Sequence, residues 1–179
     1  MPDRSTLARA VYDVAHITGT FRLRSGVTSH EYFDKYLFEA DPQLLLDLAT
    51  AMAPSIPAGT DALAGLELGG VPLATVLSQV TGLPTRFVRK KAKDYGTEKL
   101  AEGGTIGGQR VCVVEDVVTS GGQVVESCEA LRAEGAVITG VLCVIDREAG
   151  GVANLQAADL PLTPLFTMTE LKAAAGVPT

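Results

Sequence analysis

Two adjacent carboxylates, Glu115 and Asp116, are followed by a short turn rich in hydroxyl groups and glycine. The segment over residues 110–122 reads RVCVVEDVVTSGG, so the acids come at the end of an apolar run that is typical of a buried strand. In the turn, Thr119 and Ser120 supply hydroxyl donors, and the two glycines let backbone N–H groups face a ligand without a Cβ in the way. A helix predicted to follow adds the positive end of its dipole. The turn therefore predicts a cup for a phosphate monoester.

The two carboxylates at the rim of this cup must serve another group, because they repel phosphate. Sugar hydroxyls suit them, and so does a Mg²⁺ ion that also takes phosphate oxygens. The segment has neither the Gly-Lys-[Ser/Thr] ending of a Walker A loop nor a GxGxxG dinucleotide turn. On these residues alone, an ordinary strand-turn-helix with a Ser/Thr cap is the alternative.

A basic run lies between Arg86 and Lys99, where six Lys and Arg against two acids give a local charge of +4. The whole chain carries −6 at pH 7, so the remainder carries −10. Residues 90–108 show no periodic pattern, and connections of that length are usually functional. A mobile cationic loop beside a phosphate cup would neutralise a developing pyrophosphate and exclude water. A solvated charged loop is the alternative.

The elements that must position these groups alternate along the chain. Two helices are predicted first, one ending before Gly19 and one running from Asp41-Pro42 to Pro54. Strands and helices then alternate, with strands over 62–66, 85–88, 110–115 and 137–145 and helices over 71–81 and 123–134. Continuous apolar strands in this order indicate a parallel sheet covered on both faces, with its ligand site beyond the carboxyl ends of the strands.

Composition and charge bound the class of protein. With 46% hydrophobic and 20% charged residues, the 179-residue chain is expected to form a single globular domain over residues 1–179. An excess of acids argues against nucleic acid as a partner. No apolar run approaches the roughly 18 residues of a membrane helix, and no signal-peptide core is present, so we expect a cytoplasmic protein that makes no contact with membranes.

The cysteines and histidines give little support for metal or nucleophile chemistry. Cys112, Cys128 and Cys143 are 16 and 15 positions apart, which fits neither a disulfide framework nor a CxxC site. We expect them to be small buried apolar residues. His16 and His30 have no Cys or second His nearby in sequence, so a zinc site or a His-dependent nucleophile is poorly supported.

The segment VVEDVVTSGG, residues 113–122, resembles the phosphoribosyl pyrophosphate (PRPP) motif of type I phosphoribosyltransferases. In that family the two acids contact the ribose 2′- and 3′-hydroxyls and the loop holds the 5′-phosphate. The resemblance implies an α/β fold with a central parallel sheet flanked by helices, a small N-terminal hood mainly from residues 1–40 and a flexible catalytic loop at about 90–108. It gives Glu115 and Asp116 a catalytic role. It implies that PRPP is bound by Glu115, Asp116, Val117, Val118, Thr119, Ser120, Gly121, Gly122 and Gln123.

Residues 88–97, VRKKAKDYGT, look like the catalytic loop of the orotate phosphoribosyltransferase branch. By this resemblance Lys93 is catalytic and reaches the pyrophosphate in the transition state. Tyr95 stands where many bacterial members have histidine, which favours a hydroxyl-to-phosphate contact over acid-base work. The resemblance also implies a homodimer in which loop 89–104 closes over the neighbouring subunit's site. The residues of this loop expected to bind PRPP are Arg89, Lys90, Lys93 and Tyr95.

Two further segments match the base pocket of that branch. FRLRSG followed by EYFDK, within residues 21–35, is similar to the hood, although Arg24 stands where the family often has lysine. VIDREAGG, residues 144–151, follows a strand and contains Arg147, whose planar fork matches a carboxylate. Core packing of the hood aromatics and a salt bridge between Arg147 and Glu148 are the alternatives. The residues implied for orotate are Arg24, Phe33, Thr119 and Arg147.

The expected reaction transfers the 5-phosphoribosyl group from PRPP to orotate and gives orotidine 5′-monophosphate and pyrophosphate, in pyrimidine (UMP) biosynthesis. Mg²⁺ is the implied cofactor, bridging pyrophosphate and ribose oxygens with help from Glu115 and Asp116. Some relatives carry lysine at the position of Gly69 in the pyrophosphate-side loop, so backbone amides must do its work here. The alternatives are a purine phosphoribosyltransferase and a non-catalytic PRPP-sensing regulator that binds nucleic acid, which we expect to carry an added helical module or basic surface.

Overall fold

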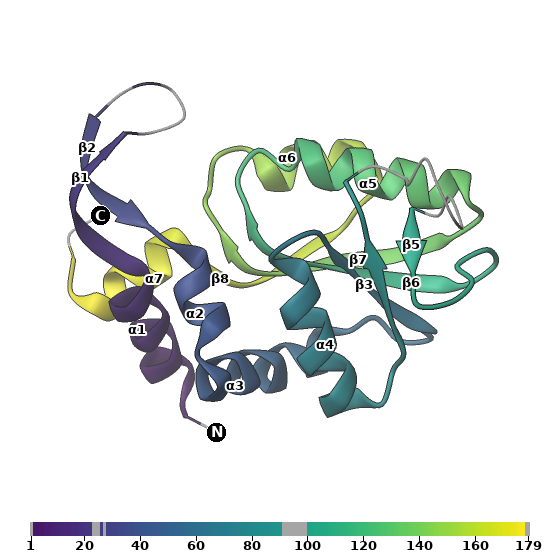
Figure 1. The fold of residues 1–179 in the computed structure, drawn as a ribbon, viewed down its shortest axis with the longest axis horizontal. Coiled ribbons are helices and arrows are strands. Elements are labelled where there is room, and N and C mark those ends of the chain that lie inside the picture. Colours follow the sequence, from purple (N-terminus) through teal and green to yellow (C-terminus); the bar gives the residue numbers. More distant parts are fainter. Residues whose placement is uncertain (1, 23–25, 27, 91–99, 178–179) are drawn as a thin grey trace.

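A six-stranded sheet forms the centre of the molecule (Figure 1). The computed structural model describes residues 2–22, 26, 28–90 and 100–177. The strand order is β5-β4-β3-β6-β7-β8, in which β5 is antiparallel to β4 and the other neighbours are parallel. The strands are β3 (Ala62–Leu66), β4 (Thr85–Val88), β5 (Ala101–Glu102), β6 (Arg110–Val118), β7 (Val137–Asp146) and β8 (Leu162–Thr167).

Helices cover both faces of this sheet, as the apolar strands predicted. Figure 1 shows α5 and α6 on one face and α3 and α4 on the other. A short 3₁₀ turn, Ala53–Ser55, ends α3 just before the chain enters β3. The helices are α1 (Arg4–Ala15), α2 (Lys35–Ala40), α3 (Pro42–Met52), α4 (Gly70–Thr81), α5 (Gly122–Ala133), α6 (Gly151–Ala157) and α7 (Met168–Ala175).

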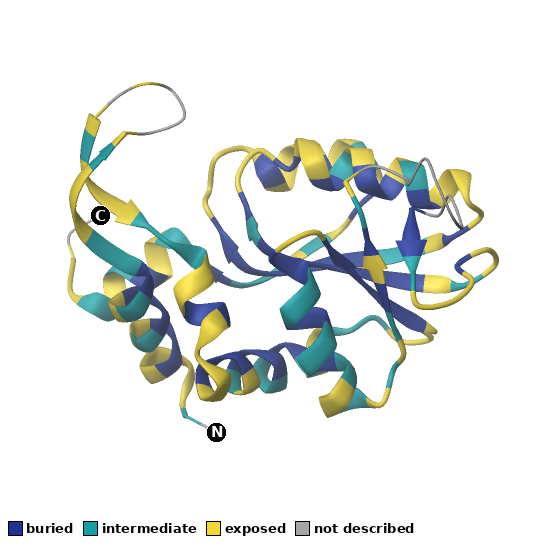
Figure 2. Ribbon diagram, viewed as in Figure 1, coloured by how far each residue is buried: buried dark blue, intermediate teal, exposed yellow. Residues whose placement is uncertain are grey.

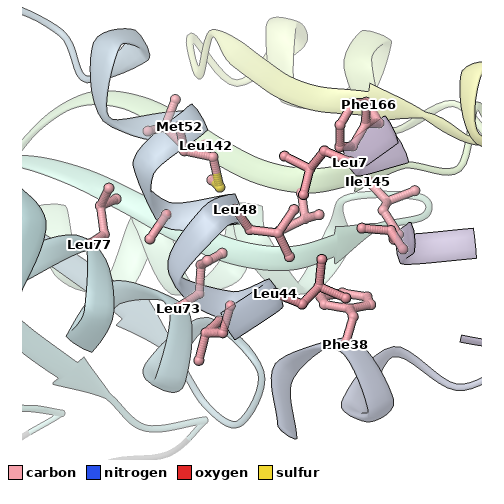
Figure 3. Close-up of a cluster of buried hydrophobic side chains, with 14 of the residues drawn as sticks. Leu7, Phe38, Leu44, Leu48, Met52, Leu73, Leu77, Leu142, Ile145 and Phe166 are labelled. Atoms are coloured by element: carbon pink, nitrogen blue, oxygen red, sulfur yellow. The ribbon is translucent and has the colours of Figure 1, made fainter. Parts of the chain in front are cut away.

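The side chains of β6 alternate between two buried clusters, one on each face of the sheet. Cys112 and Val114 join the cluster under α3 and α4, which also contains Leu48, Leu73 and Leu77 (Figure 3). Val111 and Val113, which alternate with them along β6, join the cluster under α5 and α6. All three cysteines are buried and free, and burial raises their thiol pKa values, which confirms their role as small apolar residues.

An antiparallel hairpin, β1 (His16–Arg22) with β2 (Thr28–Phe33), projects from the N-terminal end of the chain and is largely exposed (Figure 2). The C-terminal helix α7 packs against α1 beside this hairpin. At the surface between the two helices, the Arg4 guanidinium donates to both oxygens of Glu170 at 2.9 and 3.1 Å. Segments from both ends of the chain therefore build this side of the molecule.

Strand β6 is three residues longer than predicted, and that difference moves the acids. Its pairing with β7 continues through Val117 opposite Ile145 and Val118 opposite Asp146. The prediction that the strand ends at Glu115 was therefore wrong, and Glu115 and Asp116 lie inside the sheet rather than at its rim. The connection after β4 also contains a strand, since β5 pairs with β4 and Arg89 N donates to Leu100 O at 2.9 Å.

No helix among the described residues is long and apolar enough to cross a membrane.

Candidate active site

A cavity of about 670 Å³ lies between the hairpin side of the molecule and the carboxyl ends of the strands. The strand order reverses between β3 and β6, where the helices that follow them lie on opposite faces, and ligands of open α/β sheets bind at such a point. The sheet lines the cavity with Val117, Thr119 and Arg147, and the opposite wall includes Phe33 and Lys35. Three of the residues predicted for orotate are thus brought together: Phe33, Thr119 and Arg147.

Arg147 is available to a ligand rather than engaged with its neighbour. The carboxylate of Glu148 accepts the backbone N–H of Thr169 at 2.8 Å. Among the described residues there is no ion pair between Arg147 and Glu148, so the salt-bridge alternative is wrong. Phe33 is half-buried, with its ring centroid 6.4 Å from that of Tyr12, so it belongs to the cavity wall and also packs against the core.

The turn after β6 has the form expected of a phosphate cup. Gly121, with φ of 77°, precedes α5, and no side chain caps the helix N-terminus. The first backbone N–H groups of α5 are therefore free to donate hydrogen bonds to an anion. Behind the turn, Asn154 of α6 donates to the carbonyl of Ser120 at 2.8 Å, and a Cβ on Gly151 would stand 2.7 Å from the carbonyl of Thr119. This support from α6 was missed, because nothing local in the sequence links it to the turn.

Beneath the cavity, three carboxyls share one ammonium group. Glu115 and Asp116 of β6 are buried, and Glu39 of α2 is buried beside them. The Lys35 Nζ atom stands 2.6 Å from Asp116 Oδ2, and the Lys35 side chain is 34% exposed. Burying three like charges with one cation is unfavourable, so some of these carboxyls must hold protons.

The pKa values separate two protonated carboxyls, Glu39 and Glu115, from one ionised carboxylate, Asp116. Burial, followed by the hydrogen bond and the charge of Asp116, raises the pKa of Glu39 to about 9, and the same causes raise the pKa of Glu115 to about 9. Burial acts to raise the pKa of Asp116 as well. Its hydrogen bonds with Glu115, Glu39 and Lys35 outweigh that effect and lower the pKa. Asp116 is therefore the ionised acceptor of the cluster at neutral pH.

Gly69 and Gly70 press the loop after β3 against these acids. A Cβ on Gly69 would overlap the carboxylate of Asp116 and stand 2.7 Å from Glu39 Oε1, and a Cβ on Gly70 would overlap the carbonyl of Val114. The peptide bond between Glu67 and Leu68 is cis. A lysine at position 69 does not fit this arrangement, and the cation beside Asp116 is Lys35 of α2.

The basic segment divides into parts with different surroundings. Arg86 is buried in β4 and donates to the carbonyl of Thr105 at 3.1 Å and to Gln109 Oε1 at 2.9 Å. Arg89 lies 3.6 Å from Glu102 and lines a separate cavity of about 220 Å³. The exposed Lys90 donates its backbone N–H to Glu67 at 3.3 Å. Three residues of the predicted site, Arg24, Lys93 and Tyr95, lie outside the described residues.

The comparisons with known proteins agree with this geometry. The model of the phosphoribosyl transferase domain matches residues 40–158. An orotate phosphoribosyltransferase of Nocardioides sp. (strain ATCC BAA-499 / JS614) is 54% identical over 170 residues, which cover 95% of each chain. The chain belongs to the orotate phosphoribosyltransferase family.

Solved structures of orotate phosphoribosyltransferases have the same fold. The enzyme of Mycobacterium tuberculosis H37Rv in complex with Fe(III) dicitrate superposes with a TM-score of 0.86 at 29% identity, covering 95% of this chain and 99% of that one. Its complex with 5-phospho-α-D-ribosyl 1-diphosphate has a TM-score of 0.81 at 27% identity, with the same coverage. The predicted type I phosphoribosyltransferase fold is therefore confirmed.

Lys35, Glu39 and Lys172 are residues of this site that the sequence did not single out. Lys172 of α7 lines the main cavity from the C-terminal end of the chain, more than 130 positions from Lys35. Lys35 is the last residue of the segment that resembles the hood, but nothing in that segment gave it a role. The site therefore depends on contacts between distant segments that no local pattern reports.

Proposed function

We propose that this protein transfers the 5-phosphoribosyl group of PRPP to orotate, forming orotidine 5′-monophosphate and pyrophosphate in pyrimidine biosynthesis. The observation that carries this proposal is the cavity that Thr119, at the start of the phosphate cup, shares with Arg147, which forms no ion pair with any residue that the structure describes. An Arg fork binds a carboxylate in bidentate fashion, and orotate is a planar base with a carboxylate. Family membership at 54% identity supports the same reaction.

PRPP would bind along the carboxyl ends of β3 and β6. The 5′-phosphate takes the backbone N–H groups and hydroxyls of the cup, while Asp116 and Glu115 face the ribose hydroxyls. The opposite pKa shifts of these acids support contact with a sugar hydroxyl, because Asp116 accepts a hydrogen bond and a protonated Glu115 can also donate one. The residues proposed for the cup and its flanks are Val117, Val118, Thr119, Ser120, Gly121, Gly122 and Gln123.

The base would lie against Phe33, with its carboxylate toward Arg147 and with Thr119 and Arg24 as further contacts. Ring stacking and one bidentate ion pair are a common means of holding a planar anion. In this position the base nitrogen faces the ribose carbon that loses pyrophosphate. Catalysis then requires no protein nucleophile, since positioning and charge stabilisation carry the rate.

The basic loop would act on the leaving group. Lys93 is proposed to stabilise the pyrophosphate in the transition state, with Arg89, Lys90 and Tyr95 as further PRPP contacts. We expect Lys93→Ala to lower kcat by about 100-fold, with little change in PRPP affinity, because the contact is made mainly in the transition state. Steady-state kinetics with each substrate varied in turn measure this split, and an unchanged kcat would remove Lys93 from the mechanism.

Mg²⁺ fits this site as an ion brought by the substrate. Among the residues that the structure describes, no group of three or more His, Cys, Asp or Glu side chains forms a metal cage. One or two carboxylates together with substrate oxygens are the usual partners of Mg²⁺ in phosphate sites. Asp116, and Glu115 once it has lost its proton, would be the protein's contribution, and the ion would neutralise charge on the pyrophosphate.

A homodimer with loop 89–104 shared between subunits, and a location in the cytoplasm, complete the proposal. Size-exclusion chromatography with light scattering tests the dimer. Mixing two inactive variants, one altered in the loop and one in the cup, tests the sharing. Activity regained on mixing would require that a loop from one subunit serve the other.

The decisive experiment is a product assay with PRPP, Mg²⁺ and a panel of orotate, uracil, adenine, hypoxanthine and xanthine. We expect orotidine 5′-monophosphate as the main product, and we expect Arg147→Ala to raise the KM for orotate at least about tenfold through loss of its carboxylate contact. A preference for adenine, hypoxanthine or xanthine that survives Arg147→Ala would instead identify a purine enzyme. Absence of product from every base, with salt-sensitive RNA binding, would identify a regulator.

A further inference from the structure

Lys35 joins the wall of the base cavity to the acid proposed for the ribose. It is the first residue of α2, directly after the hairpin strand that contributes Phe33, and Asp34 caps the helix by accepting the N–H of Tyr36 at 3.1 Å. The Lys35 ammonium stands 2.6 Å from Asp116 Oδ2 and 5.3 Å from the centroid of the Tyr36 ring. The cation is therefore held between a carboxylate and an aromatic face.

Asp116 is fixed at both of its oxygens. Its Oδ1 atom accepts the backbone N–H of Val117 at 2.6 Å, while Oδ2 faces Lys35. Gly69 leaves no room on the other side, because a Cβ there would overlap this carboxylate. The side chain is fully buried, so water offers it no alternative partner. Among the described residues, Lys35 is thus the one cation that forms an ion pair with this carboxylate and fixes its position.

We infer that Lys35 is a positioning residue for PRPP: its ammonium holds the Asp116 carboxylate in place, so that this carboxylate accepts a ribose hydroxyl. The inference rests on the proposed function, in which Asp116 contacts the ribose. It assigns the recognition of PRPP partly to α2, a helix on the hairpin side of the molecule, far in sequence from the cup. The Lys35 side chain also lines the cavity. Lys35 therefore contacts both the space proposed for the base and the carboxylate proposed for the ribose.

The effect of Lys35 must pass through Asp116, and a double-mutant cycle isolates that route. Equilibrium binding of PRPP with Mg²⁺, measured by calorimetry, is compared for the wild type, Lys35→Met, Asp116→Asn and the double variant. We expect Lys35→Met to weaken PRPP binding about 10- to 100-fold, the size of a lost charge-assisted hydrogen bond. In the Asp116→Asn background, the same substitution is expected to change PRPP binding less than about threefold.

Two further variants separate positioning from folding and from net charge. Lys35→Arg keeps the cation and is expected to recover most of the PRPP affinity. Arg9→Met removes one positive charge from the exposed face of α1, where Arg9 pairs with Asp13 at 2.9 Å, and is expected to leave PRPP binding unchanged. If Lys35→Met does not fold, PRPP binding of the double variant is still compared with that of Asp116→Asn, because the double variant contains no unpaired aspartate charge.

Additive losses in the cycle, or a loss for Lys35→Met confined to orotate, would overturn the inference, because either result means that Lys35 acts without Asp116. Failure of the proposed function gives a different result. In that case the wild type forms no product from PRPP and orotate, whereas PRPP binding and its dependence on Lys35 are still measured by calorimetry.

Discussion

Gly69 is the residue at which the close approach of backbone and acid is tightest. Its φ of −66° is open to any residue, so the requirement for glycine comes from space and not from conformation. A Cβ would overlap the Asp116 carboxylate and stand 2.7 Å from Glu39 Oε1. The carboxylate of Asp116 is the end of a side chain and can move, but moving it breaks the arrangement with Lys35.

Gly69→Ala is therefore expected to damage function more than folding. We expect the KM for PRPP to rise at least about tenfold, as one charged hydrogen bond to the ribose is lost, while the melting temperature falls by only a few degrees. Gly122→Ala provides the stability control, because a Cβ at Gly122 meets no atom within 4 Å. A fall in stability of Gly69→Ala with normal PRPP kinetics would show that the displaced atoms do not contact substrate. Steady-state kinetics and thermal melting together provide both readouts.

At the scale of elements, apolar runs predicted the positions of the strands. The charged residues Glu115 and Asp116 led to a wrong prediction of where β6 ends. The strand over residues 85–88 has the bounds that were predicted, because it is short and is bounded by Pro84 before it and a basic run after it. β6 continues past its two acids because Lys35, some 80 positions earlier, supplies a countercharge. β5 is two residues long and exists only through its pairing with β4. Both features come from contacts between distant segments.

Arg86 gives a test of how the base of the basic loop is built. The buried guanidinium donates to the carbonyls of Thr85 and Thr105 and to Gln109 Oε1, so it joins β4 to the segment that returns to β6. Arg86→Met leaves these acceptors unpaired, and we expect a loss of about 1–3 kcal/mol in the free energy of unfolding. Hydrogen exchange over residues 100–109 is expected to accelerate.

Arg110→Met is the matched control for this change. Arg110 also donates to backbone carbonyls, those of Gly59 and Ala58, but it is exposed and water can replace it. We expect a loss below about 1 kcal/mol in urea unfolding for this variant. Equal losses for the two arginines would contradict the anchoring role given to Arg86.

At the scale of the whole molecule, the hairpin side and the sheet are joined at sites far apart in sequence. Arg4 of α1 is paired with Glu170 of α7, and Lys35 of α2 is paired with Asp116 of β6. The first pair is exposed and adds little stability. In the second pair, Asp116 is buried with two further carboxyls, Glu39 and Glu115, and this cluster makes the stability of the molecule depend on pH.

The sign of that dependence follows from the raised pKa values of Glu39 and Glu115. Their ordinary pKa is 4.5, and burial together with Asp116 raises both to about 9 in the folded protein. Between these values the folded state holds protons that the unfolded state has released, so the free energy of unfolding falls as pH rises. The contribution is complete below pH 4.5 and is lost as pH passes through about 9. Each carboxyl contributes a slope of at most about −1.4 kcal/mol per pH unit.

Glu39→Gln is expected to flatten this slope, because a neutral amide replaces the protonated carboxyl while Lys35, Asp34, Glu115 and Asp116 stay around it. Urea unfolding from pH 5 to 9 in the presence of EDTA measures the slope without bound Mg²⁺. Glu170→Gln is the control. Burial acts to raise the pKa of Glu170, but the hydrogen bond from Arg4 outweighs burial and lowers it. Glu170 therefore affects the free energy of unfolding only below about pH 4.5, and its replacement is expected to leave the slope above pH 5 unchanged. If Glu39→Gln and wild type lost stability in parallel up to pH 9, Glu39 would already be ionised in the folded protein, and the Lys35 ammonium would have to balance two charges.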